Sequence, residues 1–389
     1  MKLEPIGNLV GHVSQCDPEG LGRDWITYLD ISSVDRESKQ IIAPARIAAA
    51  TAPSRARQQV FADDILVSTV RPNLNAVALM SRQFHGDIAS TGFCVLRPSK
   101  DRVCPPYLFY FTQTDRFVSH LMRISTGASY PAVTDNDVLE TQIPLPELSE
   151  QQRIAGLLEQ ADRLRRTRRY ALELSDTFLP AAFLELFGDP VRNEKNWETK
   201  TLDEVASKIT DGEHLNPSFV KAGVPIVMAE QVEDFGVNLR SCKMVSPDDF
   251  AKFSKKCAPR LGDILVVSRG ATIGRNCVVN IDAPFCLMGS VILIKPNLDL
   301  VSPQFFAVQL KSLSFKMALQ KTSGSSAQQA IYISQLKENK VVVPPLPIQE
   351  KFAALVVRHE HLRATQREAL RQAEHLFQSL LHRAFNQES

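Results

Sequence analysis

Apolar positions recur in alternating steps of three and four along two stretches of the chain, a spacing that places side chains on one face of a long helix. The steps continue 198 positions later without a slip, so the pattern predicts two equivalent helices. Because such a helix needs a partner to cover its seam, we expect the two to pair as an antiparallel coiled coil; the alternative is that each packs only on its own globular part. The predicted seam consists of Ile154, Leu157, Ala161, Leu164, Arg168, Ala171, Ser175, Phe178 and Ala182, then Phe352, Leu355, His359, Leu362, Gln366, Ala369, Ala373, Leu376 and Leu380.

The ends of the first long helix carry recognisable signals. Ser149 is a predicted N-cap, since its hydroxyl can accept a hydrogen bond from a free backbone N–H of the first turn. Gly188, followed by Asp189 and Pro190, predicts where the helix ends. Pro180 lacks a backbone N–H, so we expect a kink or a short break there.

The regions outside the helices also repeat. DILVS at Asp64–Ser68 returns as DILVVS at Asp263–Ser268, and IPLPELSEQQ at Ile143–Gln152 is echoed by VVVPPLPIQE at Val341–Glu350. A repeat of this length indicates a duplicated domain rather than a solenoid. Proline after Cys104 and Ser302 predicts the start of a short helix at both places. Predicted strands include Ile65–Val70, Phe93–Leu96, Ile264–Val267 and Val291–Ile294.

These patterns together predict a mixed α/β protein with a pseudo-twofold internal repeat. Two globular α/β domains would be joined by two long antiparallel coiled-coil helices. The expected segments are a first globular domain at 1–148, a central helical spacer at 149–188, a second globular domain at 189–345 and a C-terminal helical spacer at 346–389.

Composition narrows the class of protein. Hydrophobic residues make up 44% of the 389 residues and charged residues 23%, as in soluble globular proteins. The longest apolar runs are far too short to cross a membrane, and Glu4 and Pro5 interrupt any signal peptide, so we expect a cytoplasmic protein. The seven cysteines lack metal-knuckle spacing, which predicts reduced thiols and no metal site.

Motifs for catalysis are weak. The sequence contains neither a dinucleotide fingerprint after a strand nor a P-loop, so no cofactor is expected in this chain. Cys104-Pro-Pro-Tyr107 differs by one residue from the Asn-Pro-Pro-Tyr loop of adenine methyltransferases, but cysteine cannot replace the amide that bonds the flipped base. Glu198-x-Lys200 is too common a triplet to indicate a nuclease, and His359-Glu360-His361 lacks helical zinc spacing. We therefore predict no catalytic residue.

Several segments resemble those of the specificity subunits of type I restriction-modification systems. Residues 144–190, PLPELSEQQRIAGLLEQADRLRRTRRYALELSDTFLPAAFLELFGDP, resemble the central conserved region of that family, and NWETKTLDEVASKITDG resembles the opening of its second recognition domain. DILVSTVRPNLNAVAL and STGASYPAVTDNDVLETQIPLP resemble parts of the first recognition domain, as GDILVVSRGATIGRNCVV and TSGSSAQQAIYISQLKENKVVVPPLP do of the second. The resemblance covers essentially the whole chain, although Pro180 and the helical stretch HEHLRATQREAL are atypical.

The resemblance implies a non-catalytic DNA-binding subunit. Each target-recognition domain would read one half of a split double-stranded DNA site, and the paired helices would act as a ruler for the gap. Methyltransferase subunits would bind the helices and supply S-adenosylmethionine chemistry on adenine, and a motor-nuclease subunit is a further candidate partner. Two other hypotheses are a self-sufficient methyltransferase or nuclease and a coiled-coil adaptor that only bridges proteins.

In each repeat the candidate DNA contacts lie in the loop after one predicted strand and in a small polar turn further along the chain. Base readout needs Arg, Lys, Asn or Gln, whereas phosphates can be bound by cations, hydroxyls and backbone amides. The arginines at 163–169 are a further candidate for DNA phosphates or an acidic partner, because few acids lie nearby in the sequence; the alternative is a solvated helix face. The candidate DNA-binding residues are Arg71, Asn73, Asn75, Ser129, Tyr130, Arg269, Thr272, Arg275, Ser325, Gln328 and Gln329.

Overall fold

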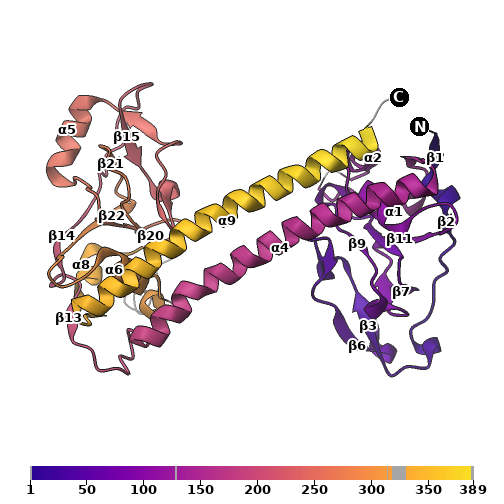
Figure 1. The fold of residues 1–389 in the computed structure, drawn as a ribbon, viewed down its shortest axis with the longest axis horizontal. Coiled ribbons are helices and arrows are strands. Elements are labelled where there is room, and N and C mark those ends of the chain that lie inside the picture. The colour runs from indigo at the N-terminus through magenta and orange to yellow at the C-terminus, as the bar shows by residue number, and fades with distance from the viewer. Residues whose placement is uncertain (1, 128, 313, 318–329, 387–389) are drawn as a thin grey trace. The chain divides into compact units, whose positions relative to one another are not determined.

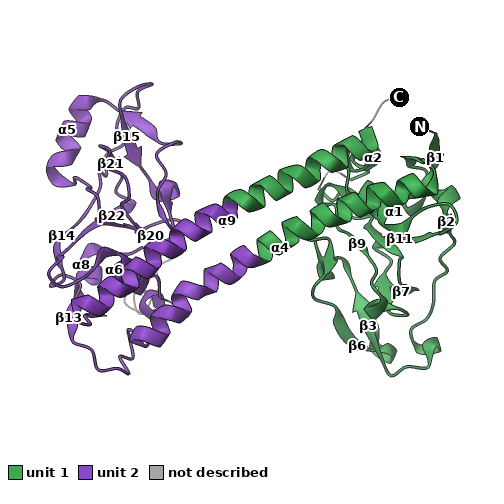
Figure 2. Ribbon diagram, in the orientation of Figure 1, with its two compact units in different colours: residues 1–170, 368–389 green, residues 171–367 purple. Residues whose placement is uncertain are grey.

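The computed structural model describes residues 2–127, 129–312, 314–317 and 330–386 (Figure 1). The chain forms two compact units, coloured separately in Figure 2. Unit 1 contains residues 1–170 and 368–389, and unit 2 contains residues 171–367. The helices α4 (Leu148–Phe187) and α9 (Leu346–Asn386) therefore contribute one part to each unit. The four segments expected from the sequence stay a prediction.

Unit 1 contains two four-stranded sheets, in the orders β2-β11-β8-β9 and β6-β3-β10-β7, and two strand pairs, β1-β12 and β4-β5. Three short helices, α1, α2 and α3, accompany them. The bounds are β1 Leu3–Pro5, β2 Val10–Gly11, β3 Trp25–Leu29, β4 Val34–Asp35, β5 Gln40–Ile41, β6 Ala45–Ala48, β7 Ala56–Gln59, β8 Ile65–Ser68, β9 Val77–Leu79, β10 Ile88–Ser90, β11 Phe93–Pro98, β12 Gln142–Pro144, α1 Pro105–Phe111, α2 Asp115–Ile124 and α3 Asp135–Leu139.

Unit 2 repeats this topology. Its main sheet has the order β14-β22-β19-β20, its smaller sheet the order β18-β15-β21, and its strand pairs are β13-β23 and β16-β17. In both smaller sheets the central strand has one antiparallel and one parallel neighbour. The bounds are β13 Thr199–Thr201, β14 Ala206–Asp211, β15 Val224–Val227, β16 Val232–Glu233, β17 Gly236–Val237, β18 Lys243–Val245, β19 Ile264–Val267, β20 Asn276–Val278, β21 Cys286–Leu287, β22 Val291–Pro296, β23 Lys340–Val342, α5 Pro247–Lys256, α6 Pro303–Lys311 and α8 Ile333–Glu338.

The predicted local elements are confirmed. The four predicted strands coincide with β8, β11, β19 and β22, which are almost entirely buried and form the centres of the two main sheets. Cys104 and Ser302 are the N-caps of α1 and α6, each followed by proline. Proline suits this position because the first N–H of a helix has no partner within the helix. The duplicated sequence therefore folds into a duplicated mixed α/β architecture.

The main core of unit 1 joins its sheet to the long helices. Phe111 and Phe117 pack edge to face beneath the sheet, and Phe385 of α9 packs against both Tyr107 and Phe111. In unit 2 the corresponding junction is a cluster of four phenylalanines whose ring centroids lie 4.7–6.5 Å apart. These four are Phe183, Phe187, Phe305 and Phe352.

The helices α4 and α9 are antiparallel within each unit. In unit 1 Arg165 lies over Phe377 and Arg169 pairs with Glu374; in unit 2 Ser175 contacts His359. Only part of the predicted seam is buried. Leu157, Leu164, Phe178, Leu362 and Leu376 are exposed, whereas their neighbours Leu158, Arg165, Leu179, Arg363 and Phe377 are buried, so the buried stripe is displaced by one residue from these predicted seam positions.

Two expectations about the ends of α4 need correction. The helix begins at Leu148, so Ser149 lies in the first turn rather than at the cap. It also continues through Pro180, so the short break is absent, and the kink, which was the other alternative, stays a prediction. Packing explains this continuity, since Leu179 and Phe183 on either side of the proline are both buried in unit 2. Gly188 does end the helix, with a positive φ of 75°.

A buried glutamine connects each long helix to its globular domain in the same way. Gln151 accepts a hydrogen bond from the N–H of Cys104 and donates to the carbonyls of Arg102 and Pro146. Gln349 lies 198 positions later and makes the three matching bonds, to Ser302, Leu300 and Pro344. In both units this single side chain satisfies buried backbone groups at the start of the short helix and of the long helix.

Candidate nucleic-acid interface

The loop after β8 brings together candidate residues from two distant segments. Arg71 adopts a left-handed conformation with φ 51°, and its N–H donates to the carbonyl of Pro131 at 2.7 Å. Its guanidinium carbon lies 4.5 Å from the ring centroid of Tyr130. Tyr130 is 67% exposed, so this stacked pair lies at the surface. A stacked guanidinium keeps its N–H donors directed along the ring plane, which suits contact with a base edge or a phosphate.

The other candidates of this loop differ in their bonding. Asn73 and Ser129 are exposed. The Asn75 amide is occupied: its oxygen accepts from Lys39 Nζ at 2.8 Å, and its nitrogen donates to the carbonyl of Thr112 at 2.8 Å. These bonds hold the loop in place, which leaves Arg71 and Asn73 as its exposed polar side chains.

The matching loop of unit 2 follows β19. Arg269 is exposed, and its backbone bridge to Ala330 corresponds to the bridge between Val70 and Ala132 in unit 1. Glycine takes the place of Arg71 here, since Gly270 has a positive φ of 100°. Thr272 and Arg275 are half-buried, and their backbones bond to each other at 3.0 Å. The candidates Ser325, Gln328 and Gln329 lie outside the described residues.

The arginines of these loops form no ion pairs with the acidic residues that the structure describes. Among the described residues, no acidic side chain forms an ion pair with Arg71, Arg269 or Arg275. By contrast, Asp64 just before β8 pairs with Arg97, and Asp263 before β19 pairs with Lys295. The cations in the main sheets thus serve the fold, whereas those in the loops stay available for a negatively charged ligand such as DNA.

The arginines between 163 and 169 correct an expectation from the sequence. Arg165 pairs with Asp162 at 2.7 Å and lies 3.9 Å over the Phe377 ring, and Arg166 shares the same acid. Arg169 pairs with Glu374 at 2.7 Å. Three of these arginines are therefore used within the chain, two by Asp162 on the preceding turn and one by Glu374 of α9. Only Arg163 and Arg168 of this run are exposed.

The motifs that suggested chemistry have structural roles. The Tyr107 hydroxyl is buried and donates to the carbonyl of Pro144 at 2.7 Å, and burial raises its pKa. His359 Nε2 lies 3.0 Å from the Ser175 hydroxyl oxygen, and Lys200 pairs with Glu198 at 2.6 Å. Burial raises the pKa of the Cys277 thiol to about 12, which disfavours the reactive thiolate.

The described residues provide neither a metal site nor a membrane-spanning helix. The described histidines, cysteines and carboxylates include no group of three placed to hold a metal ion. Within the same part of the chain, none of the helices combines the length and apolar character needed to cross a membrane.

Further candidate contacts escaped the sequence analysis. Trp25 of β3 is exposed with Arg46 of β6 over its ring, at 5.4 Å, and Phe219 is exposed with Lys243 of β18 at 4.5 Å. The two pairs lie on the smaller sheet of unit 1 and that of unit 2. The partners of each pair are more than twenty positions apart in the sequence, so only the fold could reveal them. Leu215, in the loop before Phe219, is 77% exposed.

The chain matches the family model described as type I restriction modification DNA specificity domain twice, over residues 54–174 and 194–372. It is 24% identical over 377 residues to the type I restriction enzyme MjaIX specificity subunit of Methanocaldococcus jannaschii, covering 91% of this chain and 85% of that protein. It is also 24% identical over 316 residues to the EcoBI specificity subunit of Escherichia coli, covering 72% of this chain and 65% of that one.

Solved structures show the same fold. One comes from a study of complex assembly and conformational transition of the type I R-M system; it matches with a TM-score of 0.59 and 26% identity, over 99% of this chain and 97% of that one. The type I restriction-modification S subunit from M. genitalium matches with a TM-score of 0.63 and 14% identity, over 100% and 96% of the two chains. With the two family matches covering more than half of its length, this chain belongs to the family of DNA specificity subunits of type I restriction-modification systems.

Proposed function

We propose that the chain reads a bipartite double-stranded DNA target, with one half-site bound by the recognition domain of each unit. The observation that carries the proposal is the recurrence, in the loop after the central strand of both main sheets, of an exposed cation with no ion pair to any described residue. Arg71 follows β8 and Arg269 follows β19, in loops bridged to matching segments. Two equivalent surfaces on one chain suit a DNA site with two separate halves.

The candidate residues divide by the contacts they can make. Arg71, Arg269, Arg275 and Asn73 carry donors that can reach base edges in the major groove. Tyr130, Ser129 and Thr272 suit the sugar-phosphate backbone, and Asn75 supports its loop. The proposal also includes Ser325, Gln328 and Gln329.

The proposed partners supply the chemistry. Methyltransferase subunits carrying S-adenosylmethionine would methylate adenine at the sites that this chain selects, and a motor-nuclease subunit would cut unmodified DNA. Apolar side chains exposed on the long helices offer contact area for partner subunits, since exposed apolar patches commonly mark such surfaces. They include Leu157, Leu164, Leu174, Phe178, Leu362 and Leu376. This role places the protein in the cytoplasm, with the DNA.

Modified-base sequencing of host DNA with and without the gene tests the proposal. We expect methyladenine at one split motif to disappear on deletion and to return when the gene is restored. The restored motif would give both half-sites and the gap between them. Unchanged methylation, while the methyltransferase partner is expressed and active, would contradict the proposal and favour an adaptor that only bridges proteins. S-adenosylmethionine binding or methyl transfer by the purified chain alone would instead favour a self-sufficient enzyme.

A further inference from the structure

Each unit contains a short hairpin whose tip contacts the long helices. In unit 1 the hairpin β4-β5 carries Glu37, whose carboxylate lies 3.7 Å from Arg169 Nε of α4. In unit 2 the hairpin β16-β17 carries Phe235, whose ring centroid lies 4.6 Å from Arg367 Cζ of α9. Glu37 and Phe235 are 198 positions apart, as are the two arginines. The same contact therefore occurs twice, with an ion pair in one unit and a cation–π pair in the other.

The contact is more extensive in unit 2. Besides Arg367, Arg363 Cζ lies 4.2 Å and Lys311 Nζ 5.5 Å from the Phe235 ring centroid. Lys311 also donates to the carbonyl of Asp234, and burial lowers its pKa. Arg363 is itself buried and pairs with Asp176 of α4. Cations from α6 and α9 thus meet on one ring, and such pairs strengthen when they are removed from water.

The domain holds the unit 2 hairpin from the other side. The Asn280 side chain donates to the carbonyl of Phe235 at 3.3 Å and accepts from the N–H of Val237 at 3.5 Å. Gly236 has a φ of 148°, and a Cβ there would lie 2.5 Å from the Asn280 amide. Glycine is needed for this close approach. The hairpin is therefore bonded to the domain on one side and contacts the helices on the other.

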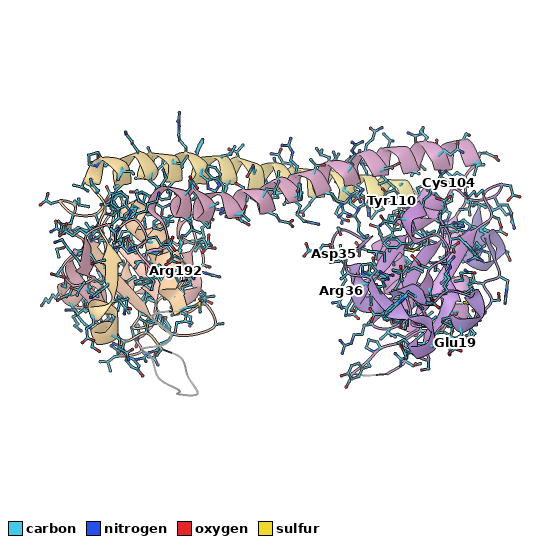
Figure 3. The ribbon with its side chains drawn as sticks, turned by 90° about the horizontal axis from the view of Figure 1, so that it is seen from below. Glu19, Asp35, Arg36, Cys104, Tyr110 and Arg192 are labelled. Carbon is cyan, nitrogen blue, oxygen red and sulfur yellow. The ribbon has the colours of Figure 1, made fainter. Side chains whose placement is uncertain are left out.

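An open cavity of about 1060 Å³ separates the hairpin from the phenylalanine cluster of unit 2. Its walls include Leu179, Val308 and Arg192, the last of which is labelled in Figure 3. At the matching place in unit 1, Tyr110 and Phe377 pack edge to face with centroids 6.0 Å apart, in the positions equivalent to Val308 and Leu179. In unit 2 the hairpin contact and the phenylalanine cluster thus lie on either side of this cavity.

We propose that Glu37 and Phe235 are positioning residues, which fix the angle of each recognition domain on the helices and so restrict the gap that the protein accepts between the half-sites. This inference rests on the proposed function. Without the Phe235 contact, the second domain would keep the phenylalanine cluster and the Gln349 hydrogen bonds, which lie on the other side of the cavity. A base step is about 3.4 Å along DNA, so a gap that is one base pair longer or shorter requires the Arg269 loop to shift by about that distance.

The test uses the complete complex in cells, with modified-base sequencing. Phe235→Ala and Phe235→Leu remove the aromatic ring, Phe235→Trp keeps an aromatic face, and Glu233→Ala is a control on the same hairpin that leaves the helix contact intact. We expect the two ring-deleting variants to raise methylation at sites with a gap one base pair longer or shorter by about tenfold, relative to methylation at the native gap. Phe235→Trp and the control should keep the wild-type gap.

A structural role alone would give a different result. If both ring-deleting variants lose methylation equally at every gap, completely or in part, or leave the ratio between gaps unchanged, the proposal is overturned. The wild-type protein provides the reference in the same experiment: a split motif that depends on the gene supports the proposed function even where the gap ratio does not change. Failure of the inference is thereby separable from failure of the proposed function.

Discussion

A comparison of equivalent positions in the two units shows which bonds are the same in both units and which differ. Gln151 and Gln349 make the same three hydrogen bonds, although their partners are Cys104 in one unit and Ser302 in the other. At the central strands, however, the bidentate pair of Arg97 with Asp64 is replaced by a single contact of Lys295 with Asp263. The retained bonds join each glutamine to backbone groups, which are present whatever the side chain at those positions. The pair that differs joins two side chains, so it changes when either residue changes.

The loops after β8 and β19 differ more between the two units than the bonds of the two glutamines do. Unit 1 has a stacked arginine at its left-handed position, and unit 2 has Gly270 there with Arg269 one residue earlier. A non-glycine residue is strained in this conformation. The loop of unit 1 therefore has a backbone cost at a position whose side chain is exposed on the surface. Strain of this kind, held by the surrounding structure, is common at functional sites.

The largest effect is expected from the two buried glutamines. Gln151→Ala and Gln349→Ala each leave one buried N–H and two buried carbonyls without their partner, so we expect each to lower the free energy of unfolding by about 3 kcal/mol. Denaturant unfolding with Gln152→Ala and Glu350→Ala as exposed neighbouring controls would measure this. A large loss in one unit and none in the other would show that the matching bonds are not equivalent in energy.

Arg71→Gly should weaken DNA binding while it relieves the backbone strain at this position. Loss of the guanidinium removes a base or phosphate contact, and we expect binding to DNA that carries the first half-site to weaken by about 1–3 kcal/mol. The free energy of unfolding should rise by up to about 1 kcal/mol, because glycine adopts the left-handed conformation freely. Binding titrations with the assembled complex and denaturant unfolding measure the two effects. Weaker binding accompanied by an equal loss of stability would contradict this prediction.

Gly270→Arg is the reciprocal change. A Cβ at Gly270 meets no described atom within 4 Å, so its cost is conformational only, on the order of 1 kcal/mol. A much larger loss of stability would indicate that unit 2 needs glycine for a reason other than its backbone angle.

Local patterns were sufficient to predict the repeat, the central strands and the helices that start at Pro105 and Pro303. The sequence could not show which seam positions face inward, because that depends on the domain beside each helix. The sequence also suggested too few acidic partners for the arginines near 165. Arg169 pairs with Glu374 and Glu37, which are distant in the sequence and lie beside it only in the folded chain. Asn75 looked free for the same reason, although Lys39 and Thr112 hold its amide.

Exchanging the cations of the main sheets should give an effect that differs between the two units. Arg97 bonds both Asp64 oxygens and the carbonyl of Gln59, and lies over Phe61. Arg97→Lys therefore loses a fork of bonds, and we expect a cost of about 1–2 kcal/mol. Lys295→Arg keeps a cation beside Asp263 and should change stability by less than about 0.5 kcal/mol. Equal costs in denaturant unfolding would contradict the difference in geometry between the two pairs.

The smallest predicted effect is a pH dependence confined to unit 2. Burial lowers the pKa of His359 below its ordinary value of 6.5, while the matching position of unit 1 is Ala161. Above pH 6.5 the imidazole is neutral in both folded and unfolded chains, so it adds no pH dependence. As the pH falls below 6.5 the unfolded chain binds a proton that the folded chain resists, and stability decreases by at most about 1.4 kcal/mol per pH unit. Denaturant unfolding should therefore show that the stability of unit 2 decreases between pH 7.5 and pH 5.5 in the wild type. The decrease should be smaller in His359→Ala, and His361→Ala serves as the exposed control. An unchanged pH dependence in His359→Ala would assign the effect to Glu360 or to other groups near it.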